Sequence, residues 1–377
     1  MINKEKILLT ANTSWFLYNF FKNIIKDLIA RNYQIICAAP RDKYSQKLIS
    51  LGCDYRELNF NQKSTNPLSE LKTLAKFFFL IREINPSLAI NFTIKNNIYG
   101  SISSAVLGIK SIAFITGLGT AFIGNRSIKY IAKFLYKIAM RSPKAIFCLN
   151  EDDFNYLKDE KIVKSEKLIL LMGLGVDKDK FNPDKKIKIF GKKRFLYVGR
   201  MLKDKGIHEL IGSFKKLTKE FSNVELILTG PIDSINSTAI SKKEIEDWTC
   251  HPNIDYRGNV EDISEIYAVA DYLILPSYRE GLPAVLLEAS MMEICILASD
   301  VPGCREVIED GYNGLLFKPR NVESLFLALK KALKLSSREK EYLEKNARKK
   351  ALLTYESSII SKSIISIFEQ KIHNSTQ

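Results

Sequence analysis

Two loops in the second half of the chain carry the residue types that bind phosphate and sugar groups. In the first loop, an apolar run ends at Val198, Gly199 lets the backbone turn, and Arg200 and Lys205 flank a polar segment. Gly206 then opens an amphipathic helix. Two cations beside a helix N-terminus match the negative charge and forked oxygen acceptors of a diphosphate. Two solvated loop cations would give the same pattern, so the loop by itself favours a diphosphate site only slightly.

The second loop, with the sequence P-S-Y-R-E-G-L-P, is followed by a largely apolar helix. Glu280 lies in the loop and Glu288 lies just over one turn inside the helix. Gly281, Leu282 and Pro283 lead into that helix, and the backbone amides available within 281–284 point toward the same space. A carboxylate can accept hydrogen bonds from two neighbouring hydroxyls, as in ribose binding. Each glutamate could instead be an ordinary charge near a helix N-terminus, but a carboxylate on an apolar helix needs a partner or a ligand.

Short apolar runs and helical patterns alternate along the whole chain. We expect buried strands at 6–11, 34–40, 88–93, 111–117, 145–150, 194–199, 224–230, 271–277 and 295–299. We expect helices at 15–31, 67–85, 96–107, 126–141, 207–220, 261–270, 284–293 and 321–334. Continuous apolar strands with intervening helices indicate parallel sheets covered on both faces. The alternation occurs twice, which predicts an α/β protein of two doubly wound, Rossmann-like domains facing across a cleft.

The domain bounds follow from a segment rich in Gly, Lys and Asp. We expect a first domain at 1–175, a linker at 176–193, a second domain at 194–354, and a C-terminal helix at 355–377 that could pack back on the first domain. In open α/β sheets, ligands bind where strands end and helices begin. The two loops with candidate chemistry both lie at such positions.

Positive charge is concentrated in the first part of the chain. The net charge is +15 over 377 residues, and residues 1–150 hold 21 Lys and Arg against 7 Asp and Glu. Between Glu83 and Glu151 the sequence has no acidic residue. The first domain is therefore suited to an anionic partner. The six cysteines show no metal-ligand spacing and do not cluster with the three histidines, which favours reduced thiols and no bound metal.

At this point the residues resemble those of the retaining glycosyltransferase family 4, which has the GT-B fold. The motifs are a Glu, seven residues and a Glu (Glu280, Glu288), G-R-x-x-x-x-K-G at 199–206, G-V-D-x-x-x-F at 175–181 and D-V-P-G-C-R-E-V at 300–307. The resemblance implies that Arg200 and Lys205 stabilise a leaving nucleotide diphosphate, that Glu288 holds the ribose hydroxyls, and that Glu280 contacts the donor sugar. It also implies that the loops after Gly230 and around Gly258, Asn259 and Val260 frame the base, and that Gly199 belongs to the donor-binding residues. No cofactor or metal is implied, because the cations neutralise the diphosphate.

The first domain departs from the commonest pattern of that family. The loop after the first strand lacks paired glycines, and the domain has no histidine. Candidate substitutes at strand ends are Asn12, Thr13, Asn91, Thr93, Lys95, Gly117 and Gly119. The arrangement is similar to a sub-group that builds bacterial surface polysaccharides. The resemblance implies transfer of a hexose or N-acetylhexosamine from a UDP-sugar to a polyprenyl-diphosphate-linked saccharide.

A basic helical segment offers a second indication of the partner. Lys129, Lys133, Lys137 and Arg141 recur every four residues and line one face of the expected helix at 126–141. Such a helix could dock on anionic lipid headgroups, or it could be a core helix with a solvated lysine face. With neither a signal peptide nor a run of about 18 apolar residues, we expect a cytoplasmic protein, peripheral on the inner face of the plasma membrane.

Other classes of protein fit less well. A nucleotide-sugar 2-epimerase could share the architecture, but it would need acid/base carboxylates and histidines in the cleft. A dinucleotide-dependent oxidoreductase would show G-x-G-x-x-G after a first strand, and neither domain does. A nucleic-acid-binding protein would explain the charge, but the sequence shows no helix-turn-helix signal, zinc spacing or basic strand with interleaved aromatics. We therefore expect no nucleic-acid partner.

Overall fold

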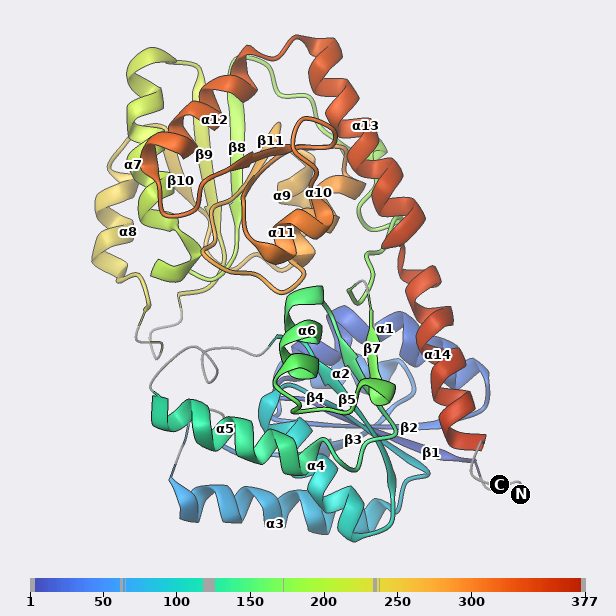
Figure 1. The fold of residues 1–377 in the computed structure, drawn as a ribbon. Helices are drawn as coiled ribbons and strands as arrows, with labels where there is room; N and C mark the ends of the chain where they lie inside the picture. Colours follow the sequence, from blue (N-terminus) through green and yellow to red (C-terminus); the bar gives the residue numbers. More distant parts are fainter. Residues whose placement is uncertain are drawn as a thin grey trace. The chain divides into compact units, whose positions relative to one another are not determined.

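A computed structural model describes residues 4–61, 64, 66–117, 126–171, 173–232, 236 and 238–373. The chain divides into two compact units (Figure 1). Unit 1 comprises residues 1–174 and 358–377, and unit 2 comprises residues 175–357. The segment predicted as a linker belongs to unit 2, and most of the predicted C-terminal helix belongs to unit 1. Each unit is described here by itself.

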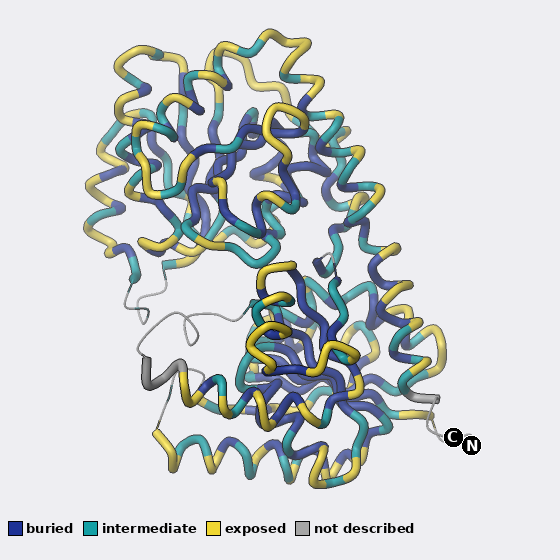
Figure 2. The backbone as a smooth tube through the Cα atoms, in the orientation of Figure 1, coloured by how far each residue is buried: buried dark blue, intermediate teal, exposed yellow. Residues whose placement is uncertain are grey.

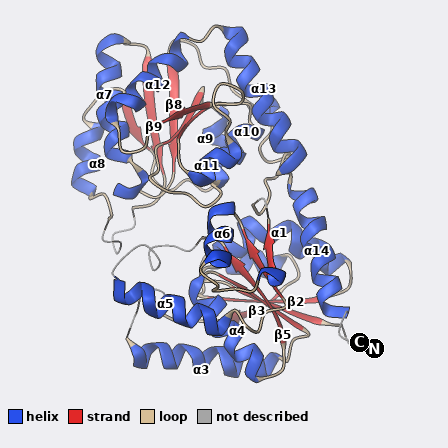
Figure 3. Ribbon diagram, viewed as in Figure 1, coloured by secondary structure: helices blue, strands red, loops and turns tan. Residues whose placement is uncertain are grey.

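Unit 1 is a parallel sheet with helices on both faces (Figure 3). Its strands are β1 (Lys6–Thr10), β2 (Gln34–Ala39), β3 (Asp54–Glu57), β4 (Leu88–Phe92), β5 (Lys110–Ile115), β6 (Ala145–Cys148) and β7 (Leu168–Leu170). Its helices are α1 (Ser14–Ala30), α2 (Ser45–Ser50), α3 (Pro67–Ile84), α4 (Ile94–Val106), α5 (Arg126–Ala139), α6 (Glu151–Asp159), the short 3-10 turn η2 (Ser165–Lys167) and α14 (Ser357–His373). The strand order is β3-β2-β1-β4-β5-β6-β7. The order reverses between β1 and β4, and this reversal is the switch point of the sheet.

Unit 2 repeats the same plan. Its strands are β8 (Lys193–Val198), β9 (Val224–Thr229), β10 (Ile254–Tyr256), β11 (Tyr272–Leu275), β12 (Cys295–Ser299) and β13 (Leu315–Phe317). Its helices are α7 (Ile207–Glu220), α8 (Lys242–Thr249), α9 (Ile263–Ala268), α10 (Ala284–Met291), α11 (Pro302–Val307), α12 (Val322–Lys334) and α13 (Ser337–Thr354), with 3-10 turns η3 (Pro183–Lys185) and η4 (Lys203–Lys205). The order is β10-β9-β8-β11-β12-β13, with the switch point between β8 and β11. The predicted pair of doubly wound α/β domains is confirmed.

The cores explain why these runs form central strands. Every residue of β4, β6 and β12 is buried, because helices cover both faces of each sheet (Figure 2). The C-terminal helix α14 completes the core of unit 1, where Ile364 and Phe368 are fully buried. Its Phe368 ring meets the edges of Phe114 and Phe147 on strands β5 and β6. The C-terminal helix is therefore part of the N-terminal unit.

Candidate active site

The two loops with candidate chemistry meet at the switch point of the unit 2 sheet. Arg200 and Lys205 follow β8, and Glu280 follows β11, the strand that pairs with β8 in parallel. Because the carboxyl ends of adjacent parallel strands lie on the same side of a sheet, the side chains of these two loops come close together. There the ammonium of Lys205 lies 2.6 Å from a carboxylate oxygen of Glu280. Both side chains are largely buried, with 21% and 13% of their surface exposed.

Close backbone contacts hold the two loops together. The amide of Tyr278 donates to the carbonyl of Asp204 over 3.0 Å. Gly206 has a φ of +70°, and a Cβ placed there would lie 2.1 Å from the carbonyl oxygen of Pro276. Only glycine combines this left-handed conformation with so close an approach. Because Lys205 directly precedes this glycine, the close approach places Lys205 beside the loop after β11.

Arg200 is exposed at the same edge. The buried Tyr197 hydroxyl donates to the Arg200 carbonyl over 3.0 Å, and the neighbouring amides of Gly199 and Met201 donate to Thr229 and Pro231. The backbone that carries the guanidinium is thus fixed on both sides. Two cations from one loop, one exposed and one half-buried, can bind a diphosphate from two directions.

Tyr278 and Glu209 support this edge and were missed by sequence reasoning. The Tyr278 hydroxyl donates to a Glu209 carboxylate oxygen over 2.6 Å, and the Arg320 guanidinium lies 4.5 Å from the Tyr278 ring centre. Burial, followed by the hydrogen bond to Glu209, raises the pKa of Tyr278 to about 12. The hydroxyl therefore stays protonated and tethers the loop of Glu280 to helix α7. An aromatic residue two positions before Glu280 was the available signal.

Glu288 has the partner that its apolar helix requires. The Tyr267 hydroxyl of α9 donates to a Glu288 carboxylate oxygen over 2.9 Å. Burial raises the pKa of Glu288, and the Tyr267 hydrogen bond and the Lys180 charge act in the opposite direction. Phe181, the last residue of the G-V-D-x-x-x-F motif, packs edge-on against Tyr267 with ring centres 5.7 Å apart. Tyr267 was not predicted, because nothing in its local sequence distinguishes it from a core tyrosine.

Glycines allow the other loops at the carboxyl ends of the unit 2 strands to pack backbone against backbone. A Cβ on Gly230 would lie 1.9 Å from the Gly199 carbonyl oxygen, and one on Gly303 would lie 1.7 Å from that of Gly281. Gly281, Leu282 and Pro283 lead directly into α10, as predicted. Asn259 is exposed and Val260 is half-buried just after β10. The residues predicted to frame the base therefore lie at the ends of adjacent strands.

The candidate residues of unit 1 gather at its own switch point. Asn12 and Thr13 follow β1, and Thr93 and Lys95 follow β4, the neighbouring strand. The Thr10 hydroxyl donates to the Asn91 side-chain oxygen over 2.8 Å, which ties the two strand ends together. Thr13 caps helix α1, since its hydroxyl oxygen accepts a hydrogen bond from the Phe16 amide.

Thr93 has an unusual backbone conformation at the start of α4. Its φ of 70° and ψ of 163° fall in a region that is essentially reserved for glycine. For a β-branched residue this conformation is unfavourable by about 1–3 kcal/mol. The Thr93 hydroxyl oxygen accepts a hydrogen bond from the side-chain nitrogen (Nδ2) of Asn96 over 2.9 Å. Strain of this size concentrates at functional sites, which agrees with the position of Thr93 at the switch point.

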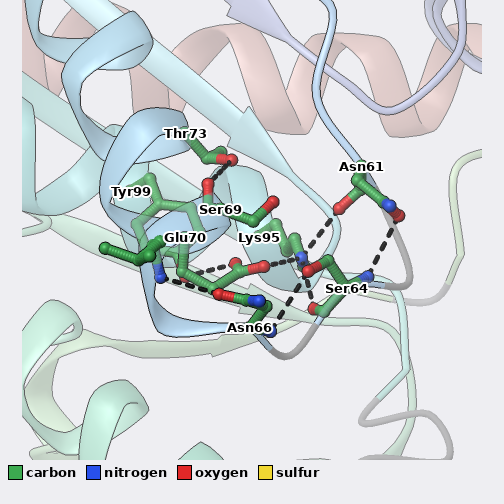
Figure 4. A network of polar contacts seen from close by, with 9 residues as sticks. Asn61, Ser64, Asn66, Ser69, Glu70, Thr73, Lys95 and Tyr99 are labelled. Atoms are coloured by element: carbon green, nitrogen blue, oxygen red, sulfur yellow. Dashed lines mark hydrogen bonds and ion pairs between the residues drawn. The ribbon is translucent and has the colours of Figure 1, made fainter.

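Lys95 lies in a polar network rather than extending from the strand end (Figure 4). Its ammonium donates to the carbonyls of Asn61 and Ser64, each over 2.8 Å, and to a Glu70 carboxylate oxygen over 2.6 Å. The Tyr99 hydroxyl donates to the other Glu70 oxygen over 2.6 Å. Lys95 therefore fastens the loop before α3 to α4. Gly117 follows β5 with a φ of +142°, and Gly119 lies outside the described residues.

Helix α5 exposes large apolar side chains beside its cations. Tyr130, Ile131 and Phe134 are 75%, 61% and 64% exposed, and Ile138 is 40% exposed. The face that packs on the unit carries Ala132, Tyr136 and Ala139. Lys133 pairs with Glu160, whereas Lys137 and Arg141 lie on the exposed side. The side chain of Lys129 lies outside the described part of the structure.

Three further observations concern metals, thiols and membranes. Among the described residues, no group of three or more His, Cys, Asp or Glu side chains is arranged to hold a metal ion. All six cysteines are unpaired thiols, and only Cys250 is exposed. None of the helices in the described part of the chain has the length and apolar character needed to cross a membrane.

Two doubly wound parallel α/β units are the architecture of the GT-B class of folds, and the Lys205–Glu280 pair lies at the switch point of the second unit. Residues 6–150 match the family model described as glycosyl transferase 4-like, and residues 179–350 match the one described as glycosyl transferases group 1. Both units of the chain therefore match family models of glycosyltransferases.

Relatives with recorded activities resemble it over much of their length. An N,N'-diacetylbacillosaminyl-diphospho-undecaprenol alpha-1,3-N-acetylgalactosaminyltransferase of Campylobacter jejuni is 27% identical over 374 residues, covering 95% of this chain and 96% of the relative. A capsular polysaccharide biosynthesis glycosyltransferase of Staphylococcus aureus is 27% identical, covering 80% and 81%. A UDP-Gal:alpha-D-GlcNAc-diphosphoundecaprenol alpha-1,3-galactosyltransferase of Escherichia coli is 23% identical, covering 70% of each chain.

Solved structures share the fold at lower identity. A protein from Anabaena, solved with UDP and glucose, superposes with a TM-score of 0.79 at 17% identity, covering 97% of this chain and 100% of that one. A candidate UDP-N-acetylglucosamine 2-epimerase of Listeria monocytogenes superposes with a TM-score of 0.68 at 13% identity, covering 99% and 98%. The fold is therefore common to transferases and to proteins named as epimerases, and the site must separate them.

Proposed function

We propose that the protein transfers a hexose or N-acetylhexosamine from a UDP-sugar to a polyprenyl-diphosphate-linked saccharide, with retention of configuration at the anomeric carbon. The product would be an intermediate of O-antigen, capsule or exopolysaccharide synthesis. The observation that carries the proposal is the Lys205–Glu280 pair at the switch point of unit 2, 2.6 Å apart and largely buried. The names of the three relatives support the acceptor class and the pathway.

The donor side of the reaction follows from the chemistry of the residues at the carboxyl ends of the unit 2 strands. When the sugar leaves, negative charge grows on the diphosphate, and fixed cations beside it lower the barrier. Arg200 and Lys205 would supply that charge without a metal. Glu280 holds the Lys205 ammonium in place and would contact the sugar, since a carboxylate accepts hydrogen bonds from sugar hydroxyls. Glu288, fixed by Tyr267, would accept the ribose hydroxyls.

The acceptor half rests on unit 1. Its switch point presents neutral polar groups, including Asn12, Thr13 and Thr93. A saccharide bears hydroxyls that such groups bind, while the surrounding positive charge of the unit favours a diphosphate-linked acceptor. With no histidine in residues 1–150, the proton of the attacking hydroxyl would leave through the departing diphosphate or solvent.

We place the enzyme in the cytoplasm at the inner face of the plasma membrane. The exposed apolar residues of α5 lie beside Lys137 and Arg141, the combination that binds anionic lipid surfaces. A lipid-linked acceptor requires such a location. Binding to anionic vesicles at low salt, with loss in the Lys133→Glu/Lys137→Glu variant, supports this placement. Equal binding by the variant contradicts it.

The test of the reaction is a donor screen. UDP- and GDP-sugars are incubated with a polyprenyl-diphosphate-linked saccharide, and nucleotide release and the anomer of the product are recorded. Release with a UDP-hexose or UDP-N-acetylhexosamine, only when acceptor is present and unchanged by EDTA, is the expected result. Lys205→Ala and Glu280→Ala should abolish release while the protein stays folded. Full activity in either variant would remove the basis of the proposal.

The alternative function is nucleotide-sugar 2-epimerisation. It requires acid/base groups beside the sugar, and unit 1 offers no histidine for this role. Incubation with UDP-N-acetylglucosamine in the absence of acceptor separates the two reactions. Formation of a 2-epimer identifies an epimerase, whereas an unchanged donor that reacts once acceptor is added identifies a transferase.

A further inference from the structure

A cationic pocket of about 850 Å³ lies in unit 1, apart from the candidate residues at the switch point of that unit. It is formed where β6 and β7 begin, by the ends of α5 and α6 and the segment from Lys161 to Lys167. The switch-point residues lie at the opposite edge of the same sheet, where strands end. Its volume falls within the range of about 300–1,000 Å³ that is typical of small-molecule sites.

The lining is strongly basic. Six cationic residues contribute to it: Lys137, Arg141, Lys158, Lys161, Lys164 and Lys167. Asp159 is the one acidic residue in the lining. Of the nearby acids, Glu160 pairs with Lys133, and Glu166 lies 3.7 Å from Lys164 with both side chains mostly exposed.

The positive charge of these residues is greater than the negative charge that surrounds them. The C-termini of α5 and α6 face this edge, and each carries a partial negative charge of about half a unit. Subtracting both helix ends and Asp159 leaves about four positive charges around the pocket. The Lys167 ammonium donates to the Arg141 carbonyl, so the wall is held together from within. Burial, followed by the charges of Lys144 and Lys164, lowers the pKa of Lys167, as expected where cations crowd one another.

The pocket continues onto the exposed face of α5. At 100° per residue, Lys137 falls within about 60° of Phe134 around the helix, and Arg141 follows just after α5 ends at Ala139. Tyr130 and Ile138 lie within about 40° of Phe134 on either side. Large apolar side chains thus stand on the same helix face as Lys137, one of the cations of the pocket wall. A ligand with a phosphate group and an apolar tail would contact both surfaces at once.

We propose that this pocket binds the phosphate-bearing headgroup of an anionic phospholipid while the apolar face of α5 enters the lipid surface. This assignment rests on the proposed peripheral location of the enzyme. It adds a defined headgroup site to the basic helix α5 that was proposed to contact the membrane. A soluble phosphate compound could match the charge alone. The apolar side chains beside the pocket favour a lipid as its source.

The test uses Lys161→Glu/Lys164→Glu, which changes the pocket without altering α5. The matched control is Lys215→Glu/Lys219→Glu, two exposed lysines of α7 in unit 2, with the same change in net charge. The full-length proteins are sedimented with vesicles of phosphatidylcholine, with and without phosphatidylglycerol. Binding of glycerol 1-phosphate and of pyrophosphate is measured separately by calorimetry. Circular dichroism and thermal melting check the fold of each variant.

We expect the pocket variant to lose binding to phosphatidylglycerol vesicles by about tenfold or more, and the control variant to bind nearly as the wild type does. Equal losses in both variants would reduce the effect to net charge and overturn the proposal. If Lys161→Glu/Lys164→Glu loses pyrophosphate binding but binds vesicles as the wild type does, the pocket binds a soluble ligand. That result would also overturn the proposal.

Transfer to a detergent-solubilised acceptor is measured in the same proteins. We expect it to be unchanged by Lys161→Glu/Lys164→Glu. If the wild type does not transfer sugar, the proposed function fails, whatever the vesicles show. If it transfers sugar but the pocket variant binds vesicles normally, only the pocket assignment fails.

Discussion

The Lys205 ammonium and the Glu280 carboxylate lie 2.6 Å apart, although 75 positions separate them in the chain. Strands β8 and β11 end side by side at the switch point, and the contact of Gly206 with Pro276 keeps their loops together. The pair is thus a product of sheet topology. It fixes where a cation would meet the charge of a departing diphosphate.

The first prediction concerns the charge of that pair. Glu280→Gln keeps the size of the side chain but removes its charge, so Lys205 loses its anchor and the sugar loses a strong acceptor. We expect turnover to fall by about a hundredfold to a thousandfold with the fold retained. Steady-state kinetics measure the effect. Glu323→Gln, which breaks the exposed Lys216–Glu323 pair, is the control and should leave turnover unchanged.

The second prediction concerns Glu288. In Glu288→Gln we expect KM for the nucleotide-sugar to rise about tenfold, because an amide accepts hydroxyl hydrogen bonds less strongly than a carboxylate. Tyr267→Phe should produce a smaller rise, since it removes the group that orients Glu288. An unchanged KM in Glu288→Gln would exclude Glu288 from the donor site.

The same variant gives a prediction for stability against pH. Burial raises the folded-state pKa of Glu288 above its ordinary 4.5, so the folded protein holds this proton more tightly than the unfolded chain. The wild type should therefore lose stability as pH rises from 4.5 through the raised pKa. Glu288→Gln lacks this loss. Its free energy of unfolding, relative to the wild type, should increase across that window in denaturant titrations.

The third prediction concerns Gly206. Its φ of +70° is shared by Gly108, which has nothing within 4 Å of a Cβ position. Gly206→Ala and Gly108→Ala therefore suffer the same backbone strain, but only Gly206→Ala meets the Pro276 carbonyl. We expect Gly206→Ala to be more destabilising by about 2 kcal/mol, and to lower turnover as Lys205 moves from Glu280. Similar unfolding midpoints for the two variants would contradict the contact.

The fourth prediction concerns strain at Thr93. Thr93→Gly and Thr93→Ala both remove the hydroxyl that accepts from Asn96, but only glycine relieves the backbone strain. We expect Thr93→Gly to be more stable than Thr93→Ala by about 1 kcal/mol. Both should raise KM for the acceptor and leave KM for the donor unchanged. A change in KM for the donor instead of the acceptor would place Thr93 outside the acceptor site.

The fifth prediction concerns the exposed face of α5. Ile131→Ser and Phe134→Ser remove apolar surface that solvent already contacts, so we expect unfolding midpoints close to that of the wild type. Binding to anionic vesicles should weaken, because the helix has less apolar surface to place in the lipid. Leu327→Ser and Leu353→Ser, at exposed positions of unit 2, are the controls. Loss of stability in the α5 variants would instead indicate a core role.

Much of the fold followed from the sequence. The apolar runs that predicted central strands, such as 88–93 and 295–299, are fully buried strands β4 and β12. The short strands β3, β7, β10 and β13 were missed. Strand β3 has no buried residue, and β7 and β10 each have one buried and two half-buried residues. All four of these strands form sheet edges, where one neighbouring strand is missing and burial is less complete. Periodicity is weakest in such places.

The sequence alone determined which residues could bind a diphosphate and sugar, because Arg200, Lys205, Glu280 and Glu288 occur in loops and helix starts after apolar strands. Tertiary structure decided their partners. Tyr267 of α9 meets Glu288 of α10, Tyr278 of the loop after β11 meets Glu209 of α7, and Lys95 pairs with Glu70. Periodicity also indicated which residues of α5 share a face, but not which face is covered. That depends on the elements packed against the helix, and contacts between distant segments are not written in the local sequence pattern.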